Sequence, residues 1–265
     1  MFNKKQKSKQ KKSPIKGNPL RNPGQSLDEE IQRRFENDVV PYLFVSVFSV
    51  VLAGLEWWRW YKELPYSPVV YTILATIIVL YSIYKLFNII KPIRKMVLGR
   101  DGEKVVGQYL DLLREKGYSV FHDIIGVGFN IDHVIISKHG IFALETKTYS
   151  KPAKGKAVIN YLNDKISING YELERNPLIQ SKAASTEVKE ILKQSTGKDY
   201  FVRPVVLFPG WYVEPKNANS NKEAWVLNPK ALPAFIENQP VILSQEEVKL
   251  AEYHMSRHIR TTKST

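Results

Sequence analysis

Two long stretches without a charged residue constrain this chain more than any other feature. Residues 39 to 55 form the first, and residues 69 to 84 form the second, which apolar residues after Lys85 extend to Ile90. As helices, about 20 residues cross the ~30 Å hydrocarbon core of a bilayer. Trp and Tyr residues cluster at positions 57 to 61, as in an interfacial aromatic belt. The pattern predicts a transmembrane helical hairpin over residues 39–90, with spans at about 39–58 and 69–90. The alternative is a buried helical pair in a soluble protein.

The distribution of basic residues predicts the orientation of this hairpin. Ten Lys or Arg residues precede the first stretch, only two lie in the connecting loop, and four follow the second by residue 100. Positively charged flanks remain on the cytoplasmic side. A cleaved signal peptide is not expected, because the apolar stretch starts near residue 39 and no small-residue cleavage site follows. We therefore expect a multi-pass protein of the cell membrane with both termini cytoplasmic.

Charge composition points to polyanionic partners. The 39 Lys and Arg residues exceed the 26 acids and give a net charge of +13, which favours nucleic acid or an anionic lipid bilayer. Seven lysines and no acid occupy the first 16 residues. We interpret residues 1–38 as a disordered basic arm, because they contain too little apolar surface to offset the entropy of ordering. The absence of cysteine excludes disulfides and thiolate metal sites.

The remaining residues alternate between helix and strand patterns, which predicts a mixed α/β domain. An amphipathic helix begins near Gly99 and stops at Gly117, with Tyr109 on its apolar side. A strand, a hairpin and a small meander follow. We expect another helix, a buried strand and a terminal helix after them. The local signals are turns at Asn163–Asp164 and Asn169–Gly170, Asn176 and Pro177 opening a helix, the strand "RPVVLFPG", and a Ser244/Glu247 capping box for a helix ending near His258.

The hairpin "IDHVIISKHGIFALETK" places two acids and a lysine on apolar strands. With a two-residue turn at His139–Gly140, Asp132 lies opposite Lys147 and shares a face with Glu145 and Lys147. The other face carries Ile131, Ile135, Phe142 and Leu144 toward a core. A three-residue turn would instead place Asp132 on the opposite side from Glu145.

Such a group has a definite chemistry. Paired carboxylates bind a hard divalent cation, Mg²⁺ or Mn²⁺, which polarises a phosphodiester. A neighbouring lysine orients or helps to deprotonate a water and stabilises the charge on phosphorus. The alternative is an Asp–Lys ion pair between strands with a solvated glutamate beside it.

Four short motifs occur in order: "GRDGE", "NIDHVIIS", "GIFALETKTY" and "NPLIQ". Together they resemble the nuclease-related domain (NERD) family of the restriction-endonuclease-like, PD-(D/E)XK, superfamily. The resemblance covers about residues 97–215, leaves residues 216–265 as a C-terminal extension with a terminal helix, and excludes the membrane hairpin. It implies the superfamily's α-β-β-β-α-β core.

The resemblance also implies roles for individual residues. Asp132 and Glu145 would be metal ligands, with the carbonyl of Thr146 as a third, and Lys147 would orient water and stabilise charge. Glu103 would hold a second metal or a water of the metal, and Gly99 and Gly102 would allow its close approach. The alternative explanation for Glu103 is favourable placement of an acid in the first turn of a helix. Gln180 would approach the scissile phosphate or the lysine from a helix N-terminus, or would simply face solvent.

Other candidates have simpler explanations. We interpret His133 as structural, and His122 and Asp123 as polar residues at a strand end. Trp211, Tyr212 and Trp225 either pack in a core or stack on bases. The sequence thus predicts a membrane-anchored, metal-dependent nuclease that hydrolyses DNA on the cytoplasmic side. The alternatives are a catalytically silent nucleic-acid-binding module and a membrane adaptor that recruits protein partners.

Overall fold

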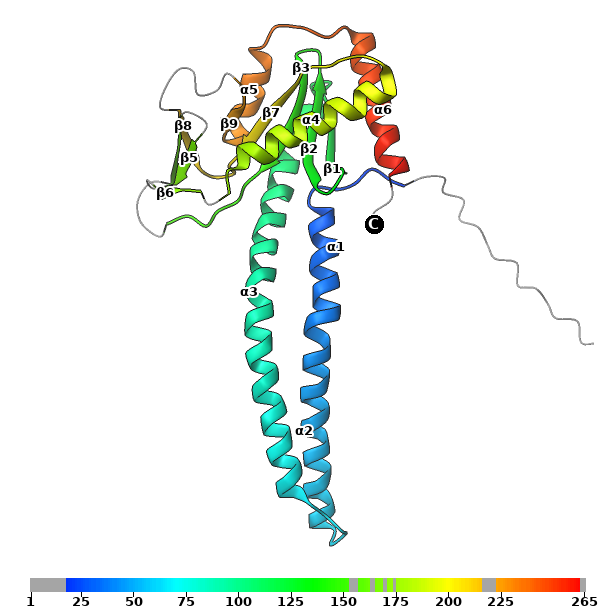
Figure 1. Cartoon of the computed structure of the whole chain (residues 1–265), viewed down its shortest axis with the longest axis vertical. Coiled ribbons are helices and arrows are strands. Elements are labelled where there is room, and N and C mark those ends of the chain that lie inside the picture. The colour runs from blue at the N-terminus through cyan, green and yellow to red at the C-terminus, as the bar shows by residue number, and fades with distance from the viewer. Residues whose placement is uncertain are drawn as a thin grey trace, which may run out of the picture.

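The computed structural model describes residues 18–152, 157–162, 165–168, 171–173, 175–215 and 223–262. Figure 1 shows a long N-terminal helical hairpin below a mixed α/β part. We call this upper part the head; it contains the strands, the later helices and the C-terminal third of α3.

The hairpin is built from helices that continue well beyond the predicted spans. Helix α1 (Gln25–Arg34) passes through a π-helical turn, η1 (Phe35–Val39), directly into α2 (Val40–Tyr61). Helix α3 (Pro68–Arg114) returns alongside them. At about 1.5 Å per residue, the 22 residues of α2 extend ~33 Å, close to the thickness of a hydrocarbon core. Both long helices are therefore of sufficient length to be membrane spans.

Side chains are distributed over the hairpin in an unusual way. Within residues 40–55 and 69–90 the buried positions are the small residues Ser49, Ala53, Ala75 and Ser82. Large apolar side chains such as Phe44 (69% exposed) face outward. Each of the two long helices contains an 18-residue window with a mean hydropathy of 2.0. A core helix of a soluble protein buries its large apolar side chains, while small residues between helices are typical of packing in lipid. Only 17% and 11% of the two apolar windows are buried, so both helices are candidate membrane spans.

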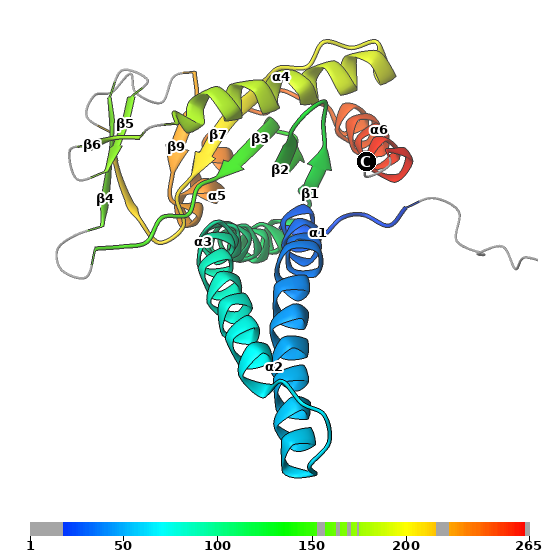
Figure 2. The ribbon, with the colours of Figure 1, turned by 60° about the horizontal axis from the view of Figure 1, so that its bottom comes forward.

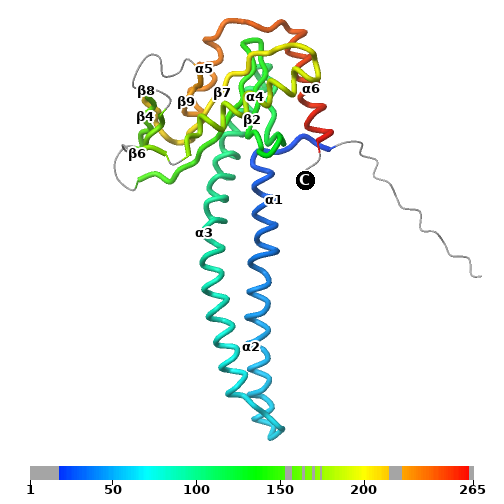
Figure 3. The backbone as a smooth tube through the Cα atoms, viewed as in Figure 1, coloured from blue at the N-terminus to red at the C-terminus, as the bar shows by residue number. Residues whose placement is uncertain are grey.

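The expectation of a disordered arm over residues 1–38 is wrong for its second half; residues 1–17 lie outside the described residues. Arg21 forms an ion pair with Asp123, and a Cβ on Gly107 would collide with Pro23. Asn18 donates its backbone N–H to the carbonyl of Arg260, which ties this segment to the end of the last helix (Figure 3). These partners are distant in sequence, so local composition could not reveal them.

Helix α3 is continuous from the second predicted span into the head. The sequence predicted a separate helix starting near Gly99, but α3 runs through Pro92 and ends at Arg114. Val106, Leu110 and Leu113 are buried on one side of this helix. Tyr109 is 39% exposed, so its predicted core position is wrong.

The head contains a five-stranded sheet with the order β1-β2-β3-β7-β9. Strands β1 (Ser119–Ile125), β2 (Asn130–Ser137) and β3 (Gly140–Thr146) are antiparallel neighbours, and β7 (Val202–Leu207) and β9 (Trp225–Leu227) continue in parallel from β3. Parallel strands need a crossover, which includes α4 (Pro177–Thr196) between β3 and β7. The predicted order of helix, three strands, meander, helix and strand is observed.

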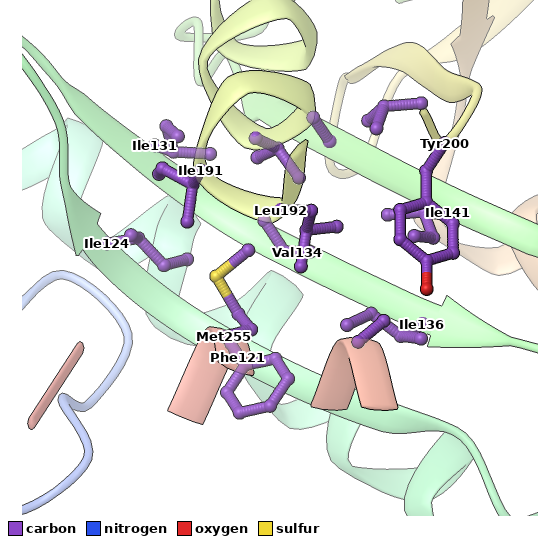
Figure 4. Packing of buried hydrophobic residues seen from close by; sticks show 14 of the residues in the cluster. Phe121, Ile124, Ile131, Val134, Ile136, Ile141, Ile191, Leu192, Tyr200 and Met255 are labelled. Atoms are coloured by element: carbon purple, nitrogen blue, oxygen red, sulfur yellow. The ribbon is translucent and has the colours of Figure 1, made fainter. Parts of the chain in front are cut away.

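Helices cover both faces of this sheet, as Figure 2 shows. On one face, α4 and α6 (Gln245–Thr261) bury a cluster that includes Val134, Leu192 and Met255 (Figure 4). On the other face, the end of α3, the 3-10 turn η2 (Pro229–Ala231) and α5 (Leu232–Glu237) cover a second cluster. The predicted caps are present: Asn176 accepts from the Leu178 N–H, and Ser244 and Glu247 form a capping box on α6.

A smaller sheet lies beyond the β9 edge of the main sheet (Figure 2). Its order is β6-β5-β4-β8, with β4 (Val158–Leu162), β5 (Lys165–Ile168) and β6 (Tyr171–Glu172) antiparallel and β8 (Tyr212–Pro215) parallel to β4. This is the expected meander with one added strand. The predicted turn residues Asn163, Asp164, Asn169 and Gly170 lie outside the described residues.

Candidate active site

The hairpin of β2 and β3 brings the two central acids together, in a register that differs from the expected one. Ser137 pairs with Gly140 and His133 with Leu144, so the turn is Lys138–His139, and Asp132 lies opposite Glu145 instead of Lys147. Gly140, with φ of 127°, takes the first position of β3 rather than the turn. Moving the turn by one residue shifts each cross-strand partner by two, and a shift of two preserves the face.

Asp132 is held by the neighbouring strand. Its Oδ2 accepts the backbone N–H of Thr146 at 2.6 Å. Burial raises the pKa of Asp132 well above its usual range, and the negative charges of Glu145 and Glu103 add to this effect. The Thr146 N–H and Lys147 oppose it. Asp132 therefore lies among like charges that only one described cation, Lys147, counteracts.

Glu145 and Lys147 form an ion pair, with 2.6 Å between Oε1 and Nζ. Glu145 is buried at the end of β3, and burial raises the pKa of its carboxyl despite Lys147. Burial alone would lower the pKa of Lys147, but Glu145 and Asp132 outweigh it and raise that pKa. Lys147 is consequently a firmly protonated cation between acids.

Glu103 reaches this group from α3. Burial raises the pKa of Glu103 to about 8, with the charges of Asp123 and Glu145 adding to the effect and Lys147 opposing it. Glu103 lies far from the start of α3 at Pro68, so placement in a first helical turn does not explain it. The close approach of α3 depends on Gly102, where a Cβ would collide with the side chain of Thr148. At Gly99 a Cβ would make only an ordinary contact with Leu27, at 3.7 Å, so the expectation for Gly99 is wrong.

Asp123 is an additional acid of the group, which the sequence interpretation assigned to a strand end. It is buried, has an unusual φ of 50°, and its Oδ2 accepts from Arg21 Nε at 2.7 Å and from the backbone N–H of Ser26 at 2.8 Å. Its charge acts on Glu103. The sequence feature that could have indicated this role of Asp123 is an acid within the mainly apolar strand "YSVFHDII".

The two neighbouring histidines form a pair of their own. His133 is fully buried, and its Nδ1 lies 2.9 Å from Nδ1 of His122, whose Nε2 lies 3.3 Å from Asp111. Burial, followed by the charge of His122, holds the pKa of His133 well below its usual range. Burial also lowers the pKa of His122, although Asp111 opposes this effect, so burial favours the neutral form of both rings.

Gln180 is not brought to the acidic group. It is exposed near the start of α4, and no hydrogen bond joins it to these acids in the part of the chain that the structure describes. Of the aromatic candidates, Trp211 and Trp225 are buried, while Tyr212 is 67% exposed. Burial thus leaves Tyr212 as the aromatic candidate that is accessible to a ligand.

The acids interact electrostatically without forming a compact ligand set. Among the described residues, no three His, Cys, Asp or Glu side chains are arranged to hold a metal ion. Glu145 is engaged with Lys147 and Asp132 with Thr146. The donor chemistry nevertheless fits a hard cation, because the carboxyl oxygens repel one another and are short of positive charge.

Comparisons with known proteins identify the region that contains this site. Residues 98–209 match the family described as nuclease-related domain, NERD, and this part of the chain is such a domain. A protein of Bacillus anthracis described as uncharacterized is 39% identical over 56 residues. The match covers 19% of this chain and 26% of that protein, so the chain spans about a quarter of the relative's length. No solved structure matches the chain significantly.

Proposed function

We propose that this nuclease-related domain hydrolyses DNA phosphodiester bonds at Asp132, Glu145 and Lys147, on the cytoplasmic side of a membrane that α2 and α3 cross. The observation that carries the proposal is the gathering of like-charged acids around Lys147. Such an arrangement raises carboxyl pKa values and costs stability, and groups of this kind concentrate at functional sites. It lies inside the matched residues 98–209.

The order of α3, β1, β2, β3, α4 and β7 supports the finer assignment. It is the α-β-β-β-α-β order that the restriction-endonuclease-like resemblance implies. The resemblance assigns the site residues to Asp132 on β2, Glu145 near the end of β3, Lys147 directly after β3 and Glu103 on the preceding helix.

Mg²⁺ or Mn²⁺ is the cofactor that this donor set would accept. Asp132 and Glu145 would hold it, with the Thr146 carbonyl and Glu103 as further oxygen donors. When bound, such a cation acts as a Lewis acid toward a phosphodiester oxygen. Its charge would also offset the repulsion between the carboxyl groups.

Lys147 is the described residue of the chain that contributes a positive charge to the candidate active site. Because the pKa of Lys147 is raised, its ammonium group stays protonated and does not act as a base. It therefore stabilises the negative charge that develops on the phosphate oxygens. The ion pair in which Lys147 donates to the carboxylate of Glu145 holds the ammonium group in place.

Membrane anchoring is supported by the outward-facing apolar side chains of α2 and α3 and the small residues between them. The excess of basic residues outside the connecting loop favours a cytoplasmic location of the head. The domain would then act on nucleic acid near the inner membrane surface.

A cleavage assay with the full chain in lipid nanodiscs tests the proposal. Single- and double-stranded DNA and RNA are incubated with Mg²⁺, Mn²⁺ or EDTA. We expect DNA cleavage that requires the metal and falls at least ~100-fold in Glu145→Ala and in Lys147→Ala. The matched control is the exposed Lys165–Glu172 pair of the small sheet, for which Lys165→Ala and Glu172→Ala should keep the wild-type rate.

The other outcomes separate the alternatives. Cleavage that survives both site substitutions would contradict this site. Metal-independent binding of DNA without cleavage would favour a silent binding module. A protein with no affinity for nucleic acid at low salt would favour a membrane adaptor, since phosphate contacts are strongest there.

A further inference from the structure

A groove of about 700 Å³ lies between the segment after β3 and strands β4 and β8 of the small sheet. It is lined by Lys151, Ala157, Val158, Gly210, Tyr212 and Glu214. This volume lies within the usual range of ligand sites. None of these residues belongs to the acidic group described above, so the groove requires its own explanation.

The groove is connected to the candidate active site by a short segment of the chain, because Lys151 of its lining lies four residues after Lys147. Lys147 donates its backbone N–H to Leu207, at 2.9 Å, and Trp211 donates its indole N–H to the carbonyl of Tyr149, at 3.2 Å. The segment from Lys147 to Lys151 therefore runs beside the segment that follows β7. Four residues reach at most ~14 Å. That distance corresponds to about four nucleotides of a stacked strand, at ~3.4 Å each.

Tyr212 gives the groove an aromatic surface on a rigid support. Tyr212 is 67% exposed as a whole residue, whereas the preceding Trp211 is 1% exposed. The Tyr212 backbone is fixed, because its N–H donates to Ala157 at 3.0 Å and the residue pairs with Val158 in the sheet. An exposed aromatic ring that is already held in place can stack on a nucleic-acid base without losing much conformational freedom.

Lys151 adds a positive charge to the same groove. Its Nζ lies 3.2 Å from the position that a Cβ on Gly210 would occupy, so the side chain lies against this glycine, whose φ is +78°. In the described ranges of the chain, no carboxylate forms an ion pair with Lys151. Glu214 is the acid of the lining, so the groove does not attract polyanions through charge alone.

We infer that this groove binds single-stranded nucleic acid next to the candidate active site, with Tyr212 stacked on a base and Lys151 on a phosphate. The inference rests on the proposed nuclease function and names the form of its substrate. A single strand can present an unstacked base to Tyr212, whereas the bases of a duplex remain stacked inside the helix.

Binding in EDTA tests the groove independently of catalysis. Anisotropy of labelled oligonucleotides is measured with the full chain in nanodiscs, for single-stranded DNA, single-stranded RNA and duplex DNA. We expect Tyr212→Ala to weaken single-strand binding at least ~5-fold and Tyr212→Phe to retain it. Lys151→Ala should also weaken it and lower the slope of log affinity against log salt by about 0.7. Duplex affinity should not depend on Tyr212.

Tyr171→Ala is the matched control for the tyrosine. Tyr171 is 80% exposed on the same small sheet, but its pairing with Ile168, next to Ile159 and Val213, places it on the other face from Tyr212. Equal affinities of Tyr212→Ala and Tyr171→Ala would overturn the inference, as would an equal loss for single strands and duplex. Metal-dependent cleavage without an effect of Tyr212 would reject the groove alone. An effect of Tyr212 without any cleavage would reject the nuclease alone.

Discussion

Glu103 illustrates how the fold changes a single side chain. In an isolated helix this glutamate would be ionised at neutral pH, because its ordinary pKa is about 4.5. Here burial, Asp123 and Glu145 raise it to about 8. The folded protein thus holds a proton that the unfolded chain releases between these two values. This proton links the charge state of the candidate site to the stability of the head.

Stability should accordingly depend on pH through Glu103. Since the folded state binds the proton more tightly, the free energy of unfolding should fall as pH rises from about 4.5 to 8 and level off above. We expect a loss on the order of 2 kcal/mol between pH 5 and pH 8, and a shallower slope in Glu103→Gln. Unfolding of the head in guanidinium, followed by tryptophan fluorescence at each pH, measures it. Glu172→Gln, an exposed glutamate, is the control, and parallel slopes in wild type and Glu103→Gln would contradict the assignment.

At the scale of elements, α3 has two roles along one continuous helix. Its N-terminal part pairs with α2, and its C-terminal part buries Val106 and Leu110 against the main sheet. Gly102 lies between these parts, against Thr148 in the segment that follows β3. The absence of a side chain at Gly102 allows the helix to approach, and this approach places Glu103 beside Glu145.

Gly102→Ala should therefore disturb the site through the position of α3. The added methyl group collides with Thr148, and we expect a loss of about 1–3 kcal/mol in unfolding free energy, together with slower cleavage. Thr148→Gly in the same chain should recover part of both losses. Gly99→Ala is the control, because that methyl group has room and alanine favours helix by up to ~1 kcal/mol. The interpretation fails if Gly102→Ala and Gly99→Ala behave alike in thermal unfolding and cleavage.

At the scale of the whole molecule, the helical hairpin acts as a support for the head. The second predicted span ends near Ile90, and the 13 residues from there to Glu103 rise ~20 Å along α3. Helix α1 runs beside this part of α3, with Asp28 bonded to Arg100 and Lys104. In a membrane-embedded chain, this paired stalk would hold the candidate site at a defined height above the bilayer.

Reporter fusions test the membrane arrangement. A reporter inserted after Leu64, in the connection between α2 and α3, should report the outer side, and one after Thr265 should report the cytoplasm. The physical reason is the excess of Lys and Arg outside that loop. Replacing Arg59 and Lys62 by alanine should leave both locations unchanged, because it increases the asymmetry. Identical compartments for the two reporters would exclude the transmembrane hairpin.

The sequence by itself was sufficient for features that depend on neighbours along the chain. The apolar stretches, the element order of the head and the Asn176 and Ser244 caps follow from local composition, periodicity and turn chemistry. The motifs of the nuclease-related domain were identified by their resemblance to that family. The choice of a two-residue turn also predicted the side of the sheet shared by Asp132 and Glu145, because shifting such a turn by one residue preserves the face.

Only the tertiary structure decided what depends on partners far away in sequence. It ordered residues 18–38 through Arg21 and Asp123, joined the span and the first head helix into α3, and placed Asp132 opposite Glu145. It also determined that Tyr212 is exposed while the adjacent Trp211 is buried. Burial, cross-strand register and electrostatic coupling are properties of the assembled fold. They arise when distant segments exclude water from one another, and a linear pattern contains no direct record of that.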